Sequence, residues 1–464
     1  MKRKLFRKES DFLGAKLLFE DLYYGIQSLR AIHNFPMTGR YVNKELVRNI
    51  LLIKKAACKA NRQTGLLSAK KAKVIIKAVN KLLVSIEEEF EAFFPLDSIQ
   101  GGAYTSLNMN VNEVIANLAL EILGERKGDY SLIHPNDDVN LSQSTNDVVP
   151  TAMQLTTITL IKQTVKSVNK LDKLLTGKAD EFNKIVKLGR THLQDAVPIS
   201  LGAEFRAYAE AMKKSGKGLE SLIKPLLTIG LGGTAIGTCQ NASKKYIGIV
   251  RKELAKITKL KLVTALNLVA ATQDQTIFSR VSSSLKILAI NLSKMANDLR
   301  LLSSGPKGGI GEIVLPALQP GSSIMPGKVN PVMPELVKQI YFLVMGNDLS
   351  ISLACESAQL ELNVMMPTMA DRLIDSFGLI NNVMEVFGEK CIKGIRVNKK
   401  TCKENLERST AYATVLAKKI GYDEMSKVVK EAEKTNKTLR DIILKRKLMS
   451  IKEFNKIIKG EKYE

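Results

Sequence analysis

The hydrophobic positions of this chain recur at helical spacing over most of its length. Apolar residues three and four positions apart predict helices over 42–60 and 69–94, with a turn between them. Before them, residues 22–25 and 29–35 look like loop and turn material. The same helical spacing predicts longer helices over residues 151–182, 199–223, 334–354 and 361–389. Strand-like alternation is nearly absent from the middle of the chain, so the pattern predicts an all-α protein.

One predicted helix carries a heptad seam of apolar residues. Successive members of the seam are alternately four and three positions apart: Val281, Leu285, Leu288, Leu292, Met295, Leu299 and Leu302. A seam of this kind packs against near-parallel neighbouring helices. It contains no His and no aromatic cluster, so we interpret it as core rather than as a cofactor site. Helices well beyond the usual three to four turns fit a bundle whose faces are buried in an oligomer.

The character of the chain changes after residue 397. The helices predicted beyond this point are shorter and cover residues 403–419, 422–435, 438–446 and 451–459. We therefore predict three domains: a mostly helical N-terminal domain over 1–145, a central long-helix bundle over 146–397, and a small C-terminal helical domain over 398–464.

Composition is that of a soluble globular protein with a large core. Of the 464 residues, 45% are hydrophobic and 25% are charged, and no apolar run is long enough to span a bilayer. Residues 1–7 are basic but lack the apolar core of a signal peptide, so we predict a cytoplasmic location and no membrane partner. The five cysteines are far apart and odd in number, which favours neither a disulfide framework nor a metal site.

The net charge of +24 raises the possibility of a nucleic-acid partner. However, the excess is mostly lysine spread along the chain, aromatic residues are only 5%, and there is no Trp. A surface that binds nucleic acid would more often cluster Arg and stacking aromatics. We favour solvated helix faces and predict no nucleic-acid partner, although a positive field would also draw dianionic substrates toward a cleft.

Residues 321–331, Gly-Ser-Ser-Ile-Met-Pro-Gly-Lys-Val-Asn-Pro, form a polar segment between long helical patterns. Two glycines permit positive φ and two prolines prevent helix, so an ordered loop is predicted. Lys328 and Asn330 lie two positions apart, which lets both reach one anion if the backbone is extended. Ser322 lies between a glycine and this cation, where an ionised hydroxyl would be stabilised. Most loops of this composition are only surface loops, but the enclosing helices argue against that interpretation here.

Two earlier polar segments precede predicted helices. The first offers Thr105 after a pair of glycines, and the second offers Ser144, Thr145 and Asn146 in succession. Helix N-termini bind anions because their first N–H groups are unpaired, so both segments could bind a carboxylate. Simple helix caps explain the same residues.

Two further segments contain candidate chemistry. Thr191 and His192 lie in a polar break over 189–198, between two long helices, which favours a functional over a structural role for this His. The glycine-rich residues 230–238 resemble a nucleotide loop only superficially. No strand is predicted before them, so the dinucleotide interpretation fails, and we predict a turn between antiparallel helices.

The segment 321–331 strongly resembles the signature of the aspartase/fumarase superfamily, G-S-x-x-M-x-x-K-x-N, which it matches at every position. The resemblance covers essentially the whole chain. It implies a lyase that eliminates ammonia, water or a larger amine to release fumarate, without an organic cofactor. It also implies a three-domain all-α fold that assembles as a homotetramer with a twenty-helix core, and active sites each built by three subunits.

The resemblance implies roles for individual residues. Ser322 falls where the family has its catalytic base, on a mobile loop that closes over the substrate. Lys328 and Asn330 match residues that bind the α-carboxylate, together with Thr191 and His192 of a neighbouring subunit.

The remaining matches concern the orientation of the His, the amino group of the substrate and its β-carboxylate. Glu335 matches the carboxylate that orients the His, and Asn146 matches the residue that holds the leaving amino group. The donors around the β-carboxylate, which becomes an enediolate, match Thr105, Ser144, Thr145 and Ser323.

Details favour the aspartases over the fumarases. Ser144-Thr145 is the aspartase pair, where fumarases usually have Ser-Ser, and 331–335 is aspartase-like. Against this, 134–138 and 232–235 look as much like fumarase. The predicted reaction is reversible deamination of L-aspartate to fumarate and ammonium, and the alternative is hydration of fumarate to L-malate.

A departure from the family lies near residues 409–412, where the chain lacks the Asn-Pro-His turn that often follows. This puts contacts of the C-terminal domain in doubt more than the chemistry. A catalytically idle descendant of the fold is a further alternative. The presence of Ser322, Lys328 and His192 argues against it.

Overall fold

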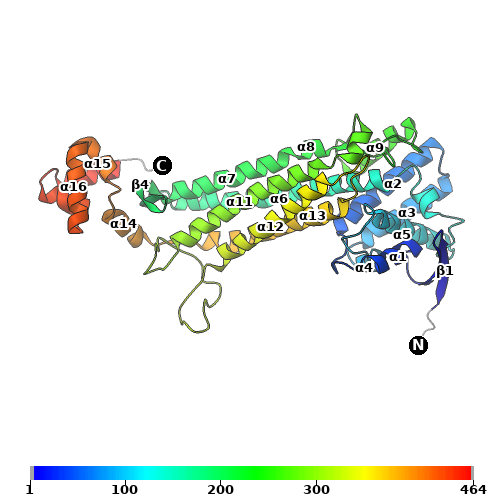
Figure 1. Cartoon of the computed structure of the whole chain (residues 1–464), viewed down its shortest axis with the longest axis horizontal. Helices are drawn as coiled ribbons and strands as arrows, with labels where there is room; N and C mark the ends of the chain where they lie inside the picture. The colour runs from blue at the N-terminus through cyan, green and yellow to red at the C-terminus, as the bar shows by residue number, and fades with distance from the viewer. Residues whose placement is uncertain (1–4, 461–464) are drawn as a thin grey trace. The chain divides into compact units, whose positions relative to one another are not determined.

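The computed structural model describes residues 5–460, which form long helices and, within that range, four two-stranded sheets (Figure 1). The predicted mainly helical class is therefore confirmed. The chain divides into two compact units. The first contains Met1–Gln163, Gly218–Lys286 and Leu343–Leu379, and the second contains Thr164–Lys217, Ile287–Phe342 and Ile380–Glu464.

The first unit begins with an antiparallel hairpin, β1 (Phe6–Asp11) and β2 (Gly14–Phe19). The helices that follow are α1 (Ile26–Asn34), α2 (Lys44–Thr64), α3 (Ala69–Ser85), α4 (Phe90–Phe93) and α5 (Thr105–Leu123). Local chemistry sets the ends of α2, because the Asn43 side chain accepts a hydrogen bond from the backbone N–H of Glu45 and Gly65 ends the helix at φ 83°. The core lies between the apolar faces of α2, α3 and α5, whose inward residues are fully buried.

The rest of the first unit contains shorter elements and parts of the long helices. The short elements are α8 (Ile223–Leu226), β5 (Thr228–Ile229), α9 (Lys244–Thr258), β6 (Val263–Thr264) and α10 (Leu268–Gln273). The long helices are α6 (Thr145–Glu181), α11 (Thr276–Leu302), α12 (Val332–Glu356) and α13 (Met366–Lys390). In this unit Asp348 of α12 accepts from Ser282 of α11 at 2.8 Å, and Asn347 donates to Ser376 of α13 at 3.0 Å.

The second unit contains further parts of these helices, α7 (Leu201–Ser221), and the hairpin β3 (Val186–Thr191) and β4 (Gln194–Ser200). Tyr208 of α7 donates to Asp298 of α11 at 2.8 Å. Gly388 of α13 approaches α6 so closely that an added Cβ would lie 3.1 Å from Leu174. The heptad seam of α11 is buried throughout, and its members Leu288 and Leu299 in this unit are fully covered, which confirms its interpretation as core.

The C-terminal part of the second unit consists of short helices. They are α14 (Lys399–Arg408), α15 (Ala413–Ile420), α16 (Tyr422–Thr435), α17 (Leu439–Lys445) and α18 (Ile451–Gly460). A two-residue strand, β8 (Arg396–Val397), pairs with β7 (Ile313–Val314) just before α14. Helices α15–α18 enclose their own apolar cluster around Leu416, Val428 and Ile442.

Several predicted boundaries were wrong. Residues 29–35 were expected to be loop but belong mostly to α1. The helix expected from residue 151 begins at Thr145, with Pro150 inside it. Pro150 lies in the second turn, where its missing N–H removes the one ladder hydrogen bond that would go to the carbonyl of Asn146.

Two predicted breaks also differ in kind. The polar break over 189–198 is largely a β-hairpin, and the helix expected over 403–419 is interrupted between α14 and α15. A two-residue strand, β5, does precede residues 230–238, contrary to expectation. It pairs in parallel with β6 in a segment too short to form a dinucleotide fold, and the backbone of the loop packs closely: a Cβ on Gly237 would lie 2.4 Å from the backbone of Val269.

Candidate active site

The signature loop, defined as residues 321–331, is closed at its neck by hydrogen bonds between its two ends. The backbone N–H of Gly321 donates to the carbonyl of Lys328 at 2.8 Å, and the Asn330 side-chain amide donates to the Gly321 carbonyl at 2.8 Å. An added Cβ on Gly321 would lie 2.5 Å from the Lys328 carbonyl oxygen, so only glycine fits. Gly327 takes a positive φ of 81° at the turn, which favours glycine. At Gly321 the reason is different, because there is no space for a side chain.

Ser322 is held by the backbone that follows it. Its Oγ accepts hydrogen bonds from the N–H groups of Ile324 at 3.2 Å and Met325 at 3.1 Å. A hydroxyl has one proton to donate and two lone pairs. Both backbone groups therefore use lone pairs of Ser322, which stabilises negative charge on this oxygen.

Ser322 and Lys328 line the same pocket of about 420 Å³. Lys328 is exposed, and among residues 5–460 its ammonium forms no ion pair. Ser323 is also exposed. The loop thus presents a cation and a negatively biased hydroxyl to one open space, as an anionic substrate requires.

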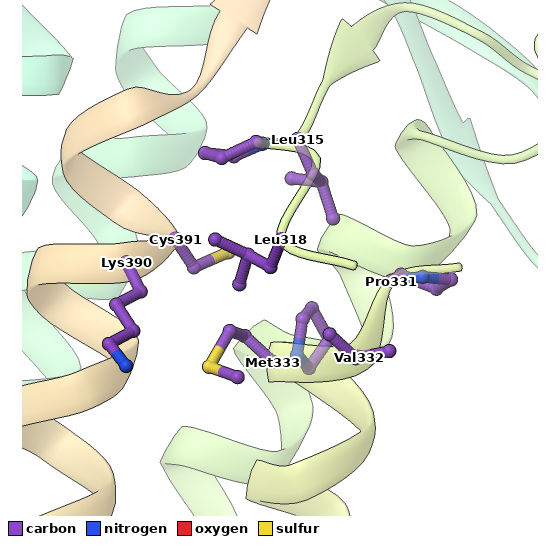
Figure 2. A pocket seen from close by; sticks show the side chains of 9 residues that line it. Leu315, Leu318, Pro331, Val332, Met333, Lys390 and Cys391 are labelled. Carbon is purple, nitrogen blue, oxygen red and sulfur yellow. The ribbon is translucent and has the colours of Figure 1, made fainter. Parts of the chain in front are cut away.

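The two stems of the signature loop rest on an apolar base. Residues 315–318 and 331–334 lie against the end of α13 and enclose a hollow of about 10 Å³, which is too small for a ligand. Figure 2 shows Leu318 and Met333 extending toward Cys391 and Lys390. The stems are therefore packed, while Ile324 in the loop is 83% exposed.

Thr191 and His192 lie at the tip of the β3–β4 hairpin. Thr191 pairs with Gln194, so His192 and Leu193 form a two-residue turn, with φ of 54° and 60°. Positive φ at both positions defines a type I′ geometry, which is unusual for a bulky residue such as Leu. Thr191, His192 and Leu193 are all exposed. The turn holds the imidazole outward at the end of a rigid element.

Glu335 lies in the first turn of α12, where a carboxylate is favoured by the helix dipole. Helical spacing puts it on the same face as Phe342, Leu349 and Leu353, which are 57%, 61% and 57% exposed. A row of large apolar side chains in solvent is typical of a surface that another protein surface covers.

Thr105 begins α5, and this helix has no side-chain cap. Gly102, Ala103 and Tyr104 before it all have positive φ, between 55° and 79°. The expected alternative of a Thr or Ser cap is therefore wrong, because the residue at the cap position is Tyr104. An uncapped N-terminus leaves its N–H groups and positive dipole end available to an anion.

Ser144, Thr145 and Asn146 lie together at the N-terminus of α6. Ser144 Oγ accepts from the N–H of Asn146 at 3.2 Å, and Thr145 Oγ1 accepts from the Asn108 amide at 3.1 Å. In both cases the hydroxyl proton stays available for donation. The Asn146 amide donates to the carbonyl of Ala235 at 2.7 Å, which leaves its oxygen as an acceptor.

Behind these donors lies a buried polar network that the sequence did not reveal. Lys54 of α2 is fully buried and donates to Asn140 at 2.7 Å, and Asn140 also accepts from Asn108. Burial lowers the pKa of Lys54 to about 7, although the charge of Asp147 opposes the shift. In the sequence, the one sign of this network is that Lys54 lies on the apolar stripe of a predicted helix.

Asp147 joins the start of α6 to the glycine-rich loop. Its carboxylate accepts from the N–H groups of Ser144, Gly232 and Thr234 at 3.0 Å each. Burial raises its pKa to about 6, against the effect of these hydrogen bonds. The glycine-rich residues therefore serve to position the α6 terminus.

The predicted site residues form two groups, one in each unit. The first unit holds Thr105, Ser144, Thr145 and Asn146, and the second holds Thr191, His192, Ser322, Ser323, Lys328, Asn330 and Glu335. Each group combines neutral donors that could bind a carboxylate, and the second adds a cation, an imidazole and Ser322.

Comparison with known proteins defines the class to which this fold and site correspond. A family model described as "Lyase" matches residues 18–346, and one described as "Fumarase C C-terminus" matches residues 413–462. The chain belongs to this lyase family, and the predicted relationship to the aspartase/fumarase superfamily is confirmed.

Its relatives narrow the class further. An aspartate ammonia-lyase of Bacillus sp is 46% identical over 97% of this chain and 96% of its own length. One from Helicobacter pylori is 43% identical over 98% of this chain and 97% of its own length. Among solved structures, a fumarate lyase:delta crystallin from Brucella melitensis has a TM-score of 0.95 at 42% identity, covering 98% of both chains. A class II fumarase from Schistosoma mansoni has a TM-score of 0.92 at 34% identity, also covering 98% of both.

Proposed function

We propose that this chain is a carbon–nitrogen lyase that converts L-aspartate reversibly to fumarate and ammonium. The observation that carries the proposal is the identity of 46% over 97% of the chain to a relative named aspartate ammonia-lyase. Other relatives of the same name match at 43–46% over nearly the full length. These relatives support the prediction of an aspartate ammonia-lyase, which details of the sequence favoured over a fumarase.

The reaction that we propose begins at Ser322. As an alkoxide, it removes a proton from Cβ of L-aspartate, and the electron pair passes to the β-carboxylate as an enediolate. That pair then returns to form the double bond as the C–N bond breaks. The ammonia that leaves takes the proton from Ser322, which releases fumarate and ammonium and restores the alkoxide. The two N–H groups that point at Ser322 Oγ support this role, since they favour the ionised form.

The other residues bind the two carboxylates in this proposal. Lys328 and Asn330, with Thr191 and His192, hold the α-carboxylate. The donors around the β-carboxylate are Thr105, Ser144, Thr145 and Ser323. Asn146 accepts from the amino group that leaves, and Glu335 orients the imidazole. The free hydroxyl protons of Ser144 and Thr145 support this assignment because the enediolate needs donors aimed at its developing charge.

We further propose that the active protein is a homotetramer whose sites combine residues of three subunits. The exposed apolar row on α12, Phe342, Leu349 and Leu353, supports an interface at this face. Glu335 shares that face, and the His192 turn is exposed, so a partner could bring a carboxylate and an imidazole together.

A cytoplasmic location is part of the proposal. All five cysteines are free thiols, which suits a reducing compartment. Within residues 5–460, no helix combines the length and apolar character needed to cross a bilayer.

The test is fumarate absorbance with purified protein given L-aspartate in one cuvette and L-malate in another. We expect a rise only with L-aspartate. A rise only with L-malate would assign the chain to the fumarases, whose structural similarity is also high. No rise with either substrate would contradict both assignments and support an idle descendant.

A further inference from the structure

Glu312 is a fully buried carboxylate that accepts four donors from two distant parts of the second unit. Arg190 donates to both oxygens, at 2.9 and 3.1 Å. The Lys187 ammonium lies 3.1 Å from one oxygen, and the Asn405 amide donates to the other at 3.1 Å. A bidentate Arg pair with two further donors fixes the orientation of every member.

Lys187 and Arg190 of β3 both reach this one carboxylate. In a regular strand these two residues, three positions apart, would point to opposite faces. The pairing of β3 with β4 is irregular between them: Leu188 pairs with Pro198 and Arg190 with Asp195, so β4 carries one extra residue there, and such a bulge bends and twists the hairpin. Gly189 lies opposite the bulge, where a Cβ would lie 2.5 Å from the Val197 carbonyl oxygen.

The arrangement is close to the tip of the hairpin. Arg190 is followed directly by Thr191 and His192, and the chain turns there. A carboxylate that fixes Arg190 therefore fixes the residue directly before Thr191 and His192. In the proposed function these two residues bind the α-carboxylate.

Glu312 also joins the hairpin to α14. Asn405 of α14 donates to the Ile310 carbonyl as well as to Glu312, and the N–H of Asn398, the cap residue of α14, donates to the Glu312 carbonyl at 2.9 Å. Leu188 of β3 packs against Leu406 of the same helix. Glu312 is thus bound by side chain and backbone between β3 and the first helix of the C-terminal part.

The second carboxylate in the cluster has a narrower role. Glu204 of α7 accepts from Lys187 at 3.0 Å, and among residues 5–460 no hydrogen bond or ion pair joins Glu204 to Arg190. Lys187 is almost fully buried and also donates to the Leu188 carbonyl at 2.8 Å. Glu204 therefore balances the charge of Lys187 without holding the strand end.

We propose that Glu312 is a positioning residue for the His192 turn, which acts through Arg190 and Lys187 and ties that turn to α14 through Asn405. The proposal rests on the proposed function, because it assigns to Glu312 the placement of residues that bind the substrate carboxylate. The signature loop begins nine residues after Glu312 in the chain.

The first measurement is steady-state kinetics of Glu312→Gln, which keeps the size of the side chain and removes its charge. We expect KM to rise and kcat to fall, with kcat/KM lowered about 10- to 100-fold, because small displacements of binding groups have effects of this size. Glu204→Gln is the matched control, since it removes a carboxylate from the same cluster and spares Arg190. It should stay within about twofold of the wild type.

A double-mutant cycle with His192→Ala distinguishes positioning from a general loss of structure. If Glu312 acts by placing His192, then Glu312→Gln should cost far less in the His192→Ala background than in the wild type. An equal loss in both backgrounds would overturn the proposal and assign Glu312 a purely structural role. Should Glu312→Gln fail to fold, Arg190→Lys replaces it in the same cycle, because it removes the bidentate pair and leaves Lys187 with Glu312.

The wild-type assay separates this proposal from the proposed function. The kcat/KM of each variant, relative to the wild type, is measured on whichever substrate, L-aspartate or L-malate, the wild type consumes. Activity only on L-malate would contradict the proposed reaction, while the ratios between variants would still decide the role of Glu312.

Discussion

The side-chain amide of Asn330 donates to the backbone carbonyl of Gly321 at 2.8 Å, which closes the signature loop at its neck. Asn330 was predicted to bind a carboxylate directly, and one of its two amide protons is engaged inside the loop. The other proton and the amide oxygen are left for a ligand. This residue can therefore shape the loop and bind substrate at once.

Gly321→Ala tests the shape of the neck. The new Cβ would meet backbone at 2.5 Å, so the neck has to open. We expect kcat/KM to fall about 100-fold, with little change in melting temperature because the loop is exposed. Gly308→Ala is the matched control, since its Cβ would meet open space. Equal activity of the two variants would contradict the importance of the closed neck.

Ser322→Ala tests the catalytic base. Loss of a general base typically lowers the rate about 10²–10⁴-fold, and we expect kcat to fall by this amount with unchanged folding by circular dichroism. A kcat near that of the wild type would show that another group removes the proton.

Lys328→Ala tests the cation of the signature loop. It should raise KM and lower kcat together, because the ammonium interacts with the substrate carboxylate in both the ground and transition states. Lys307→Ala removes another exposed lysine from the same connection between α11 and α12 and serves as the control for net charge. A similar loss in both variants would indicate a general field effect instead.

Leu349→Glu tests the exposed row on α12. A charge at the centre of an apolar interface is strongly unfavourable, so light scattering should show dissociation, and activity should fall with it. Val84→Glu changes a side chain that is 83% exposed on α3 and should leave assembly intact. Full activity of a monomeric Leu349→Glu protein would contradict sites shared between subunits.

Glu113 predicts a pH dependence of stability. Burial raises its pKa to about 7 from 4.5, despite hydrogen bonds from Ser28 and the N–H groups of Gly25 and Gln27. The folded state therefore binds this proton more tightly than the unfolded state. Its contribution to stability is complete below pH 4.5 and falls as the pH rises to 7, by at most about 3 kcal/mol.

The measurement is the melting temperature of the wild type and Glu113→Gln at several pH values in this window. The wild type should lose stability relative to the variant as the pH rises. A difference that is constant with pH would show that Glu113 has an ordinary pKa in the folded state.

Much of the fold could be predicted because long helices repeat their apolar residues locally. The heptad seam of α11 was found in this way, whereas the signature loop was found from its glycines, prolines and polar residues. Helix α1 was missed because its N-terminus is capped by the carboxylate of Glu113, 88 residues from Gly25 in sequence. A cap that is provided by another helix leaves no pattern in the local sequence.

The candidate site was predictable only as far as its exposed polar loops. The groups that hold those loops, Lys54, Asp147 and Glu312, are buried and find their partners through tertiary contacts. Their sequence context, a charged residue among apolar or glycine-rich neighbours, does not indicate which strand or helix end they bind.

The close approach of Gly189 to β4 makes this residue a condition of the chemistry, although it carries no chemical group. A Cβ at this position would meet the Val197 carbonyl oxygen at 2.5 Å, so the two strands would have to separate three residues before His192. A Gly189→Ala protein would keep Lys187, Arg190, Thr191 and His192 in the chain. An alignment that scored only those four residues would count such a protein as intact, although the strand that carries its histidine would be displaced.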